Sequence, residues 1–195
     1  MAFKKRELKG LIMLSIFSKK VKALFVCILV LVSANSFSQT SLSPEARIKD
    51  QGITLPDPAK PVGNYVSNVR VGNLLYLAGQ GPAPTSQWRG KGKVGRDLTT
   101  EEGYQAARDA CLRILATTRE AIGSLNKVKR VIKTLGMVNS DPEFKDQPKV
   151  INGCSDLMTE VFGETNGKGA RSAIGIAGLP FGNPVEVEII LEIVD

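Results

Sequence analysis

Alternating apolar and polar positions mark two strands at the end of the chain. Successive side chains of a strand point to opposite faces of its sheet. Residues 185–193 alternate so that one face is apolar and the other carries Glu186 and Glu188. Residues 170–177 alternate less clearly because several of them are small. We expect their core face to hold Ser172, Ile174 and Ile176, and their other face to hold Arg171, Ala173, Gly175 and Ala177.

Two other stretches have apolar residues at the spacing that is typical of buried helices. The first covers residues 98–123, where Thr99 and Glu102 have the spacing of a capping box. The second covers residues 148–162, and a proline suits its first turn. A glycine is expected to end each helix: Gly123 and Gly163.

Further strands complete a simple element order. They are expected over residues 128–140 and on both sides of a Gly72–Asn73 turn within residues 65–80, and residues 48–56 allow a short edge segment. The order predicts one α+β domain, in which two helices cover one face of a mixed sheet of about five to six strands. The second face would stay uncovered. Since a partly apolar open face usually belongs to an interface, we expect the chain to oligomerise.

The first residues have the pattern of a secretory signal peptide, predicted over residues 1–38. Three lysines precede an apolar run over residues 23–32, and small residues follow it. The run is about half of the ~20 residues that cross a bilayer, and an uncleaved anchor is the alternative. We expect cleavage after Ser38 and export, to the periplasm in a Gram-negative cell, with no membrane anchor afterwards. Residues 39–62 would then lead into a domain over residues 63–195.

Charge and composition exclude several function classes. Of the 26 basic and 19 acidic residues, seven basic and one acidic lie within residues 1–38, so the remaining chain is close to neutral. A near-neutral domain does not attract nucleic acid in general, and no nucleic-acid partner is expected. The chain has no histidine, which excludes Ser-His-Asp and Cys-His catalysis and histidine metal sites.

Two cysteines follow the predicted leader, Cys111 and Cys154, and both lie on the apolar stripes of predicted helices. Buried structural thiols are the expected state of such residues. Their spacing does not imply a disulfide, although an oxidising compartment would allow one.

From about residue 62 onward the chain resembles the RidA/YjgF family. The resemblance rests on the pair of helices around a strand and on two stretches, "NYVSNVRVGNLLYLAGQ" (64–80) and "ARSAIGIAGLPFGNPVEVEII" (170–190). It implies a chorismate-mutase-like fold and a homotrimer with a ligand cleft at each subunit interface. It also implies the hydrolysis of 2-imino acids to 2-oxo acids, without a metal or organic cofactor.

The resemblance implies a set of site residues as well. Arg171 would hold a substrate carboxylate through two parallel hydrogen bonds, and Glu186 would orient the attacking water. A purely structural alternative for Arg171 is an ion pair with Glu186 or Glu188 across neighbouring strands. The other implied ligand contacts are Tyr65, Ala78, Gly79, Ser155, Ala173 and Pro180.

Some of these positions depart from the family pattern. Ala78 replaces a serine and Ala173 a cysteine, and near Ser155 the family has an asparagine, for which Asn152 could substitute. The lost polar contacts favour the binding of a small acid over its efficient hydrolysis. Non-catalytic binding of small carboxylates is therefore an alternative function, and an endoribonuclease is a weaker one. Trp88 and Arg89, in the insertion after Gln80, suggest a lid.

Overall fold

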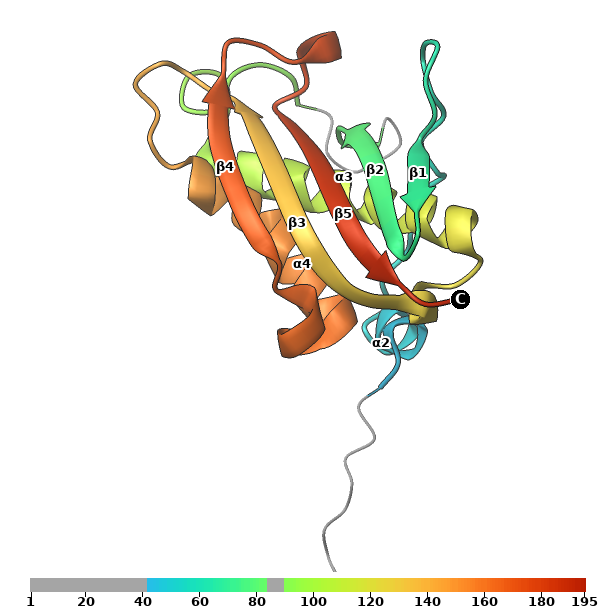
Figure 1. The fold of residues 1–195 in the computed structure, drawn as a ribbon. Helices are drawn as coiled ribbons and strands as arrows, with labels where there is room; N and C mark the ends of the chain where they lie inside the picture. Colours follow the sequence, from blue (N-terminus) through green and yellow to red (C-terminus); the bar gives the residue numbers. More distant parts are fainter. Residues whose placement is uncertain (1–41, 84–89) are drawn as a thin grey trace, which may run out of the picture. The chain divides into compact units, whose positions relative to one another are not determined.

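The computed structural model describes residues 42–83 and 90–195. The predicted signal peptide with its cleavage point and the lid residues Trp88 and Arg89 lie outside these ranges. The elements, labelled in Figure 1, are α2 (Pro44–Asp50), β1 (Asn68–Val71), β2 (Leu74–Gln80), α3 (Thr100–Ile122), η1 (Leu125–Lys127), β3 (Val128–Asn139), α4 (Gln147–Gly167), β4 (Ala170–Ile176), η2 (Pro180–Gly182) and β5 (Val185–Ile193). Within these ranges, we find no helix with the length and hydropathy that crossing a bilayer requires.

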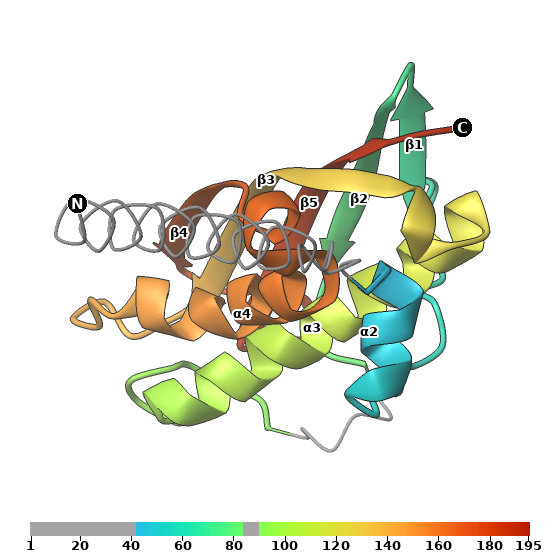
Figure 2. The same ribbon diagram turned by 90° about the horizontal axis from the view of Figure 1, so that it is seen from below.

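The strands form one five-stranded mixed sheet in the order β1-β2-β5-β3-β4. β3 and β4 run parallel, because the long helix α4 connects them, whereas the other neighbours are antiparallel. Figure 2 shows α3 and α4 on the same side of this sheet, and Figure 1 views the other side, which no described helix covers. The predicted α+β architecture with one open sheet face is confirmed.

Local capping signals account for the ends of α3, whereas α4 begins without a side-chain cap. Thr99 and Glu102 form the predicted capping box at the start of α3, and Gly123 ends the helix in the left-handed conformation. α4 contains Gly163 with φ of 82°, which breaks the helical geometry, but the helix resumes and ends only at Gly167. The predicted end at Gly163 is therefore a kink rather than a stop.

The expected edge segment within residues 48–56 is wrong. The chain instead forms helix α2, followed by a loop that is not part of the sheet. Ser43 caps this helix by accepting a hydrogen bond from the Ala46 amide, Pro44 opens it, and Glu45 lies in its first turn. These residues are typical of a helix start, and they outweigh the β-branched residues that follow.

A disulfide links the two long helices in the core. Cys111 of α3 and Cys154 of α4 are fully buried, and their Cα atoms lie 5.3 Å apart. The expectation of free thiols is wrong, because the packing of α3 against α4 brings two cysteines together that are 43 residues apart in sequence.

The face assignment of β4 is also wrong. Residues opposite one another on neighbouring strands share a face, and Thr134 of β3 lies opposite both Arg171 and the buried Ile189. Arg171 therefore lies on the helix side of the sheet, where Ala173 packs against the core. Ile174, expected in the core, is 44% exposed on the open face. β4 is an edge strand with small residues on both faces, so its pattern does not identify the core side.

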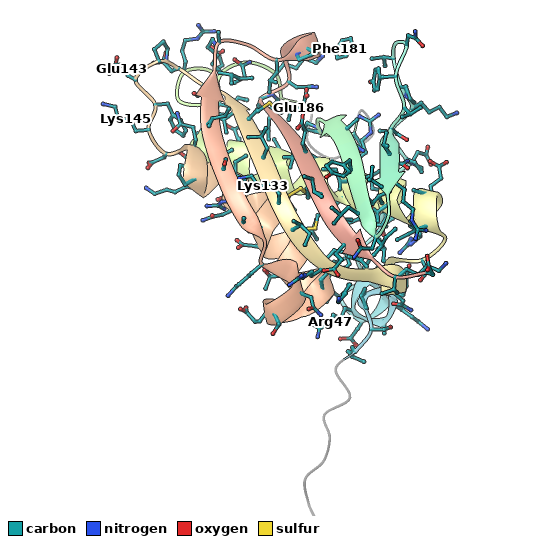
Figure 3. All side chains as sticks on the ribbon, viewed as in Figure 1. Arg47, Lys133, Glu143, Lys145, Phe181 and Glu186 are labelled. Carbon is teal, nitrogen blue, oxygen red and sulfur yellow. A yellow bond between two sulfur atoms is a disulfide. The ribbon has the colours of Figure 1, made fainter. Side chains whose placement is uncertain are left out.

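The open face of the sheet combines apolar and charged side chains. Tyr76 and Ile174 are exposed there, and Glu186 and Ile174 lie on either side of Met137 of β3, each in register with it. Lys133, labelled in Figure 3, donates a hydrogen bond of 2.7 Å from Nζ to Ser172 Oγ on this face. The predicted charged face of β5 is confirmed, but Arg171 is not part of it.

Candidate functional site

The residues expected at the site divide between two hollows of the chain. We call the first the glutamate hollow, and it has a volume of about 410 Å³. Its lining includes Tyr65, Ala78, Gly79, Pro180 and Glu186. We call the second the arginine hollow, and at about 300 Å³ it is lined by Ser155 and Arg171 among others. The two hollows share no lining residue.

A β-bulge shapes the glutamate hollow. The register between β2 and β5 shifts between Leu77 and Gln80, at the two residues Ala78 and Gly79. Bulges re-aim side chains beside functional sites. Here the Glu186 carboxylate lies so close over Gly79 that a Cβ at that position would collide with it. Glycine at position 79 thus leaves room for the carboxylate in the hollow.

Glu186 is an acid whose proton is held more tightly than usual. Burial, followed by repulsion from Glu188, raises the pKa of the Glu186 carboxyl above its ordinary value. No hydrogen bond or ion pair within the described ranges satisfies this carboxyl. Figure 3 shows Glu186 near the start of β5, at the same end of the sheet as Phe181. A partly buried carboxyl with a raised pKa is a stronger base than an ordinary carboxylate, which suits it to accept and return a proton.

Replacement of Glu186 by glutamine is expected to remove one contribution that lowers the stability of the wild type as the pH rises above about 4. The folded-state pKa lies above the unfolded-state pKa, so the folded chain keeps a proton that the unfolded chain has lost. The contribution of Glu186 to the free energy of unfolding therefore decreases as the pH rises through its folded-state pKa. Urea denaturation at several pH values measures the slope. Glu143→Gln, at an exposed loop carboxyl, is the control, and equal slopes for Glu186→Gln and wild type would contradict the assignment.

In the arginine hollow, two hydrogen bonds hold one side of the Arg171 guanidinium in place. Arg171 Nη1 donates hydrogen bonds to Asn152 Oδ1 at 2.7 Å and to Ser155 Oγ at 3.0 Å. Both acceptors lie one turn apart on α4, which packs behind β4. Ser155 and Asn152, expected to contact the ligand, thus both contact Arg171, and their contact with a ligand stays a prediction. An ion pair with Glu186 or Glu188 is excluded, because these carboxylates lie on the opposite face of the sheet.

The two hydrogen bonds on Nη1 leave Nε and Nη2 of Arg171 without a partner in the described ranges. We call these two donors the free fork. A guanidinium has five N–H donors, and the two on Nη1 are used. Nε and Nη2 have no partner among residues 42–83 and 90–195, and the side chain is exposed. These two atoms present the parallel donors that match both oxygens of a carboxylate. The local structure therefore holds Arg171 ready for an anion from outside the chain.

Ala173, expected at the site, lines neither hollow, since it packs against the core below Arg171. Eight further residues of the described ranges line the glutamate hollow, and among them Lys60, Arg113 and Phe181 were not indicated as site residues by the sequence. Phe181 has a positive φ of 58° and is 68% exposed. Its position between a proline and a glycine was the only available signal. The described ranges contain no group of three or more acidic, cysteine or histidine side chains that could hold a metal.

Comparison with known proteins gives consistent matches. A family model described as "YjgF/chorismate_mutase-like, putative endoribonuclease" matches residues 45–188. Protein TCP17 of Trypanosoma cruzi is 44% identical over 148 residues, which cover 76% of this chain and 92% of that protein. The 2-iminobutanoate/2-iminopropanoate deaminase of Dermatophagoides farinae is 29% identical over 150 residues, with coverages of 72% and 94%. The crystal structure of a protein of unknown function from Agrobacterium tumefaciens has a TM-score of 0.70 and 44% identity, and covers 77% of this chain and 92% of its own.

Proposed function

The chain belongs to the YjgF/chorismate-mutase-like family, and from that premise we propose that it binds small 2-imino or 2-oxo acids and hydrolyses the imines. The observation that carries the proposal is the free Nε and Nη2 fork of Arg171 beside an exposed edge strand. A deaminase of such imines is among the chain's relatives.

The proposed site is completed by a second copy of the chain. One chain keeps Arg171 and Glu186 on opposite faces of its sheet and in separate hollows. The free fork of Arg171 and the carboxyl of Glu186 with its raised pKa therefore do not meet within one chain. The open, partly apolar sheet face supports association, and a ring of three copies would bring the arginine hollow of each subunit to the glutamate hollow of the next. A homotrimer with three composite clefts is therefore part of the proposal.

The arginine hollow and the glutamate hollow of each composite cleft would have different chemical roles. Arg171 would hold the carboxylate of the imino acid through its free fork. Glu186 would take a proton from a water molecule as the water oxygen attacks the imine carbon. The same carboxyl would pass this proton to the imine nitrogen, which gives a carbinolamine. It would then take the proton of the new hydroxyl and give it to the amine nitrogen, so that the C–N bond breaks, ammonia leaves and the carbon becomes the carbonyl of a 2-oxo acid. No metal or organic cofactor takes part in this scheme.

Binding without turnover is the second candidate. Ala78 lines the glutamate hollow and offers no hydroxyl to a ligand or a water. A cleft with one less polar group would still bind a carboxylate at Arg171 but would orient water less well. RNA cleavage, which the family description also names, is less supported, because the chain has no histidine to act as the base.

We also propose that the domain works in an oxidising compartment after export. The disulfide between Cys111 and Cys154 supports this location, since such bonds persist outside the reducing cytosol. The predicted leader over residues 1–38 would direct the export.

The test combines turnover and binding. The wild type should release ammonia from 2-iminobutanoate, generated in the assay by a second enzyme, faster than the background rate. Glu186→Gln should abolish this release but keep the binding of 2-oxobutanoate, measured by calorimetry, while the control Glu143→Gln keeps both. Binding of the 2-oxo acid without turnover by the wild type would support the non-catalytic function. Absence of both would contradict the proposal.

A further inference from the structure

Arg113 differs from the other arginines of the chain. Every other arginine within residues 42–83 and 90–195 donates at least one side-chain hydrogen bond. Arg113 has no such bond in these ranges, and its Nε is buried without a partner. The side chain belongs to α3 and lines the glutamate hollow together with Tyr65 and Glu186.

An unpaired cation in a hollow is costly unless a ligand compensates it. Removing a guanidinium from water without an anion or acceptor destabilises the folded chain. Burial is the largest cause and lowers the pKa of the Arg113 guanidinium, which reflects the same cost. The smaller cause is the electrostatic interaction with Tyr65, which raises this pKa. The nearby carboxyl of Glu186 forms no ion pair with it. The hollow therefore contains an unsatisfied donor set that suits an anion.

We propose that Arg113 binds a second carboxylate of the ligand, so that the preferred ligand is a dicarboxylic 2-imino or 2-oxo acid. The inference rests on the proposed function, because Arg171 of the neighbouring copy is assumed to hold the first carboxylate. The two guanidiniums would then balance the two carboxylates of the ligand. The imine or keto carbon of the ligand would lie in the part of the cleft that Glu186 lines. A monocarboxylic acid would leave Arg113 uncompensated.

The test compares two ligands that differ in the second carboxylate, 2-oxoglutarate and 2-oxobutanoate. Calorimetry should show that the wild type binds 2-oxoglutarate at least about 10-fold more tightly. Arg113→Met keeps the length of the aliphatic stem and removes the charge, and should weaken 2-oxoglutarate about 10- to 100-fold while leaving 2-oxobutanoate unchanged. Lys145→Met is the control, because Lys145 is an exposed cation that lines neither hollow and should leave the binding of both acids unchanged.

A stability readout separates ligand binding from a structural role. If Arg113 serves the ligand, Arg113→Met without ligand should melt at or above the wild-type temperature, since the uncompensated cation is gone. A lower melting temperature together with equal losses for both acids would overturn the inference.

The ligand comparison also separates this inference from the proposed function. Binding of 2-oxobutanoate by the wild type without a preference for 2-oxoglutarate would overturn only the role of Arg113. If neither acid binds, the proposed function fails and the inference fails with it.

Discussion

Arg171→Ala is expected to weaken the binding of 2-oxobutanoate at least about 100-fold, because two charge-assisted hydrogen bonds to one carboxylate are lost. The fold should not change, since the guanidinium is exposed and its partners Asn152 and Ser155 can bond to water instead. Calorimetry measures the binding, and turnover of 2-iminobutanoate should fall by a similar factor.

Two further variants sharpen this result. Arg171→Lys keeps the charge but has no planar fork, so it should restore only a small part of the binding. Arg96→Ala removes an exposed guanidinium that pairs with the adjacent Asp97, and should bind as the wild type does. Wild-type affinity in Arg171→Ala would show that the anion binds elsewhere.

Loss of the disulfide is expected to have the largest effect on stability. The bond closes a loop of 43 residues, which corresponds to about 4 kcal/mol of stabilisation from the restricted unfolded chain. Urea denaturation of the wild type under oxidising and reducing conditions measures this difference without a change of sequence. The double variant Cys111→Ala with Cys154→Ala should be insensitive to the reductant, and it is the control.

The disulfide is expected to stabilise the fold strongly because it lies between the two long helices. Cys111 and Cys154 are fully buried where α3 packs against α4, so the bond connects both helices of the layer behind the sheet. Equal unfolding free energies under oxidising and reducing conditions would contradict the assignment of a structural disulfide.

Local signals explain which elements could be predicted from the sequence. Thr99, Glu102 and Gly123 specify the ends of α3 through contacts within a few residues, so the prediction is confirmed. The faces of β4 could not be predicted, since small residues on an edge strand give a weak pattern and the pairing with β3 decides the face. The disulfide depends in the same way on how two helices pack, which no spacing along the chain expresses.

The site was predictable to a different extent for each residue. Tyr65, Gly79 and Glu186 gather in one hollow as the resemblance implies. The separation of Arg171 from Glu186 follows only from the sheet register, because alternation alone placed both on one face. Arg113 could not be found from the sequence, since arginines are ordinary residues on the polar side of a helix. Only its missing partners in the folded chain distinguish it.

The most direct test of the account is complementation between two inactive variants. Arg171→Ala and Glu186→Gln should each lack turnover of 2-iminobutanoate. If each cleft combines Arg171 of one copy with Glu186 of another, a co-expressed equal mixture should regain about one quarter of the wild-type sites, because random assembly in a head-to-tail ring pairs the two intact halves at that frequency. No recovered turnover in mixed assemblies, with both variants folded and associated, would contradict a site shared between two copies.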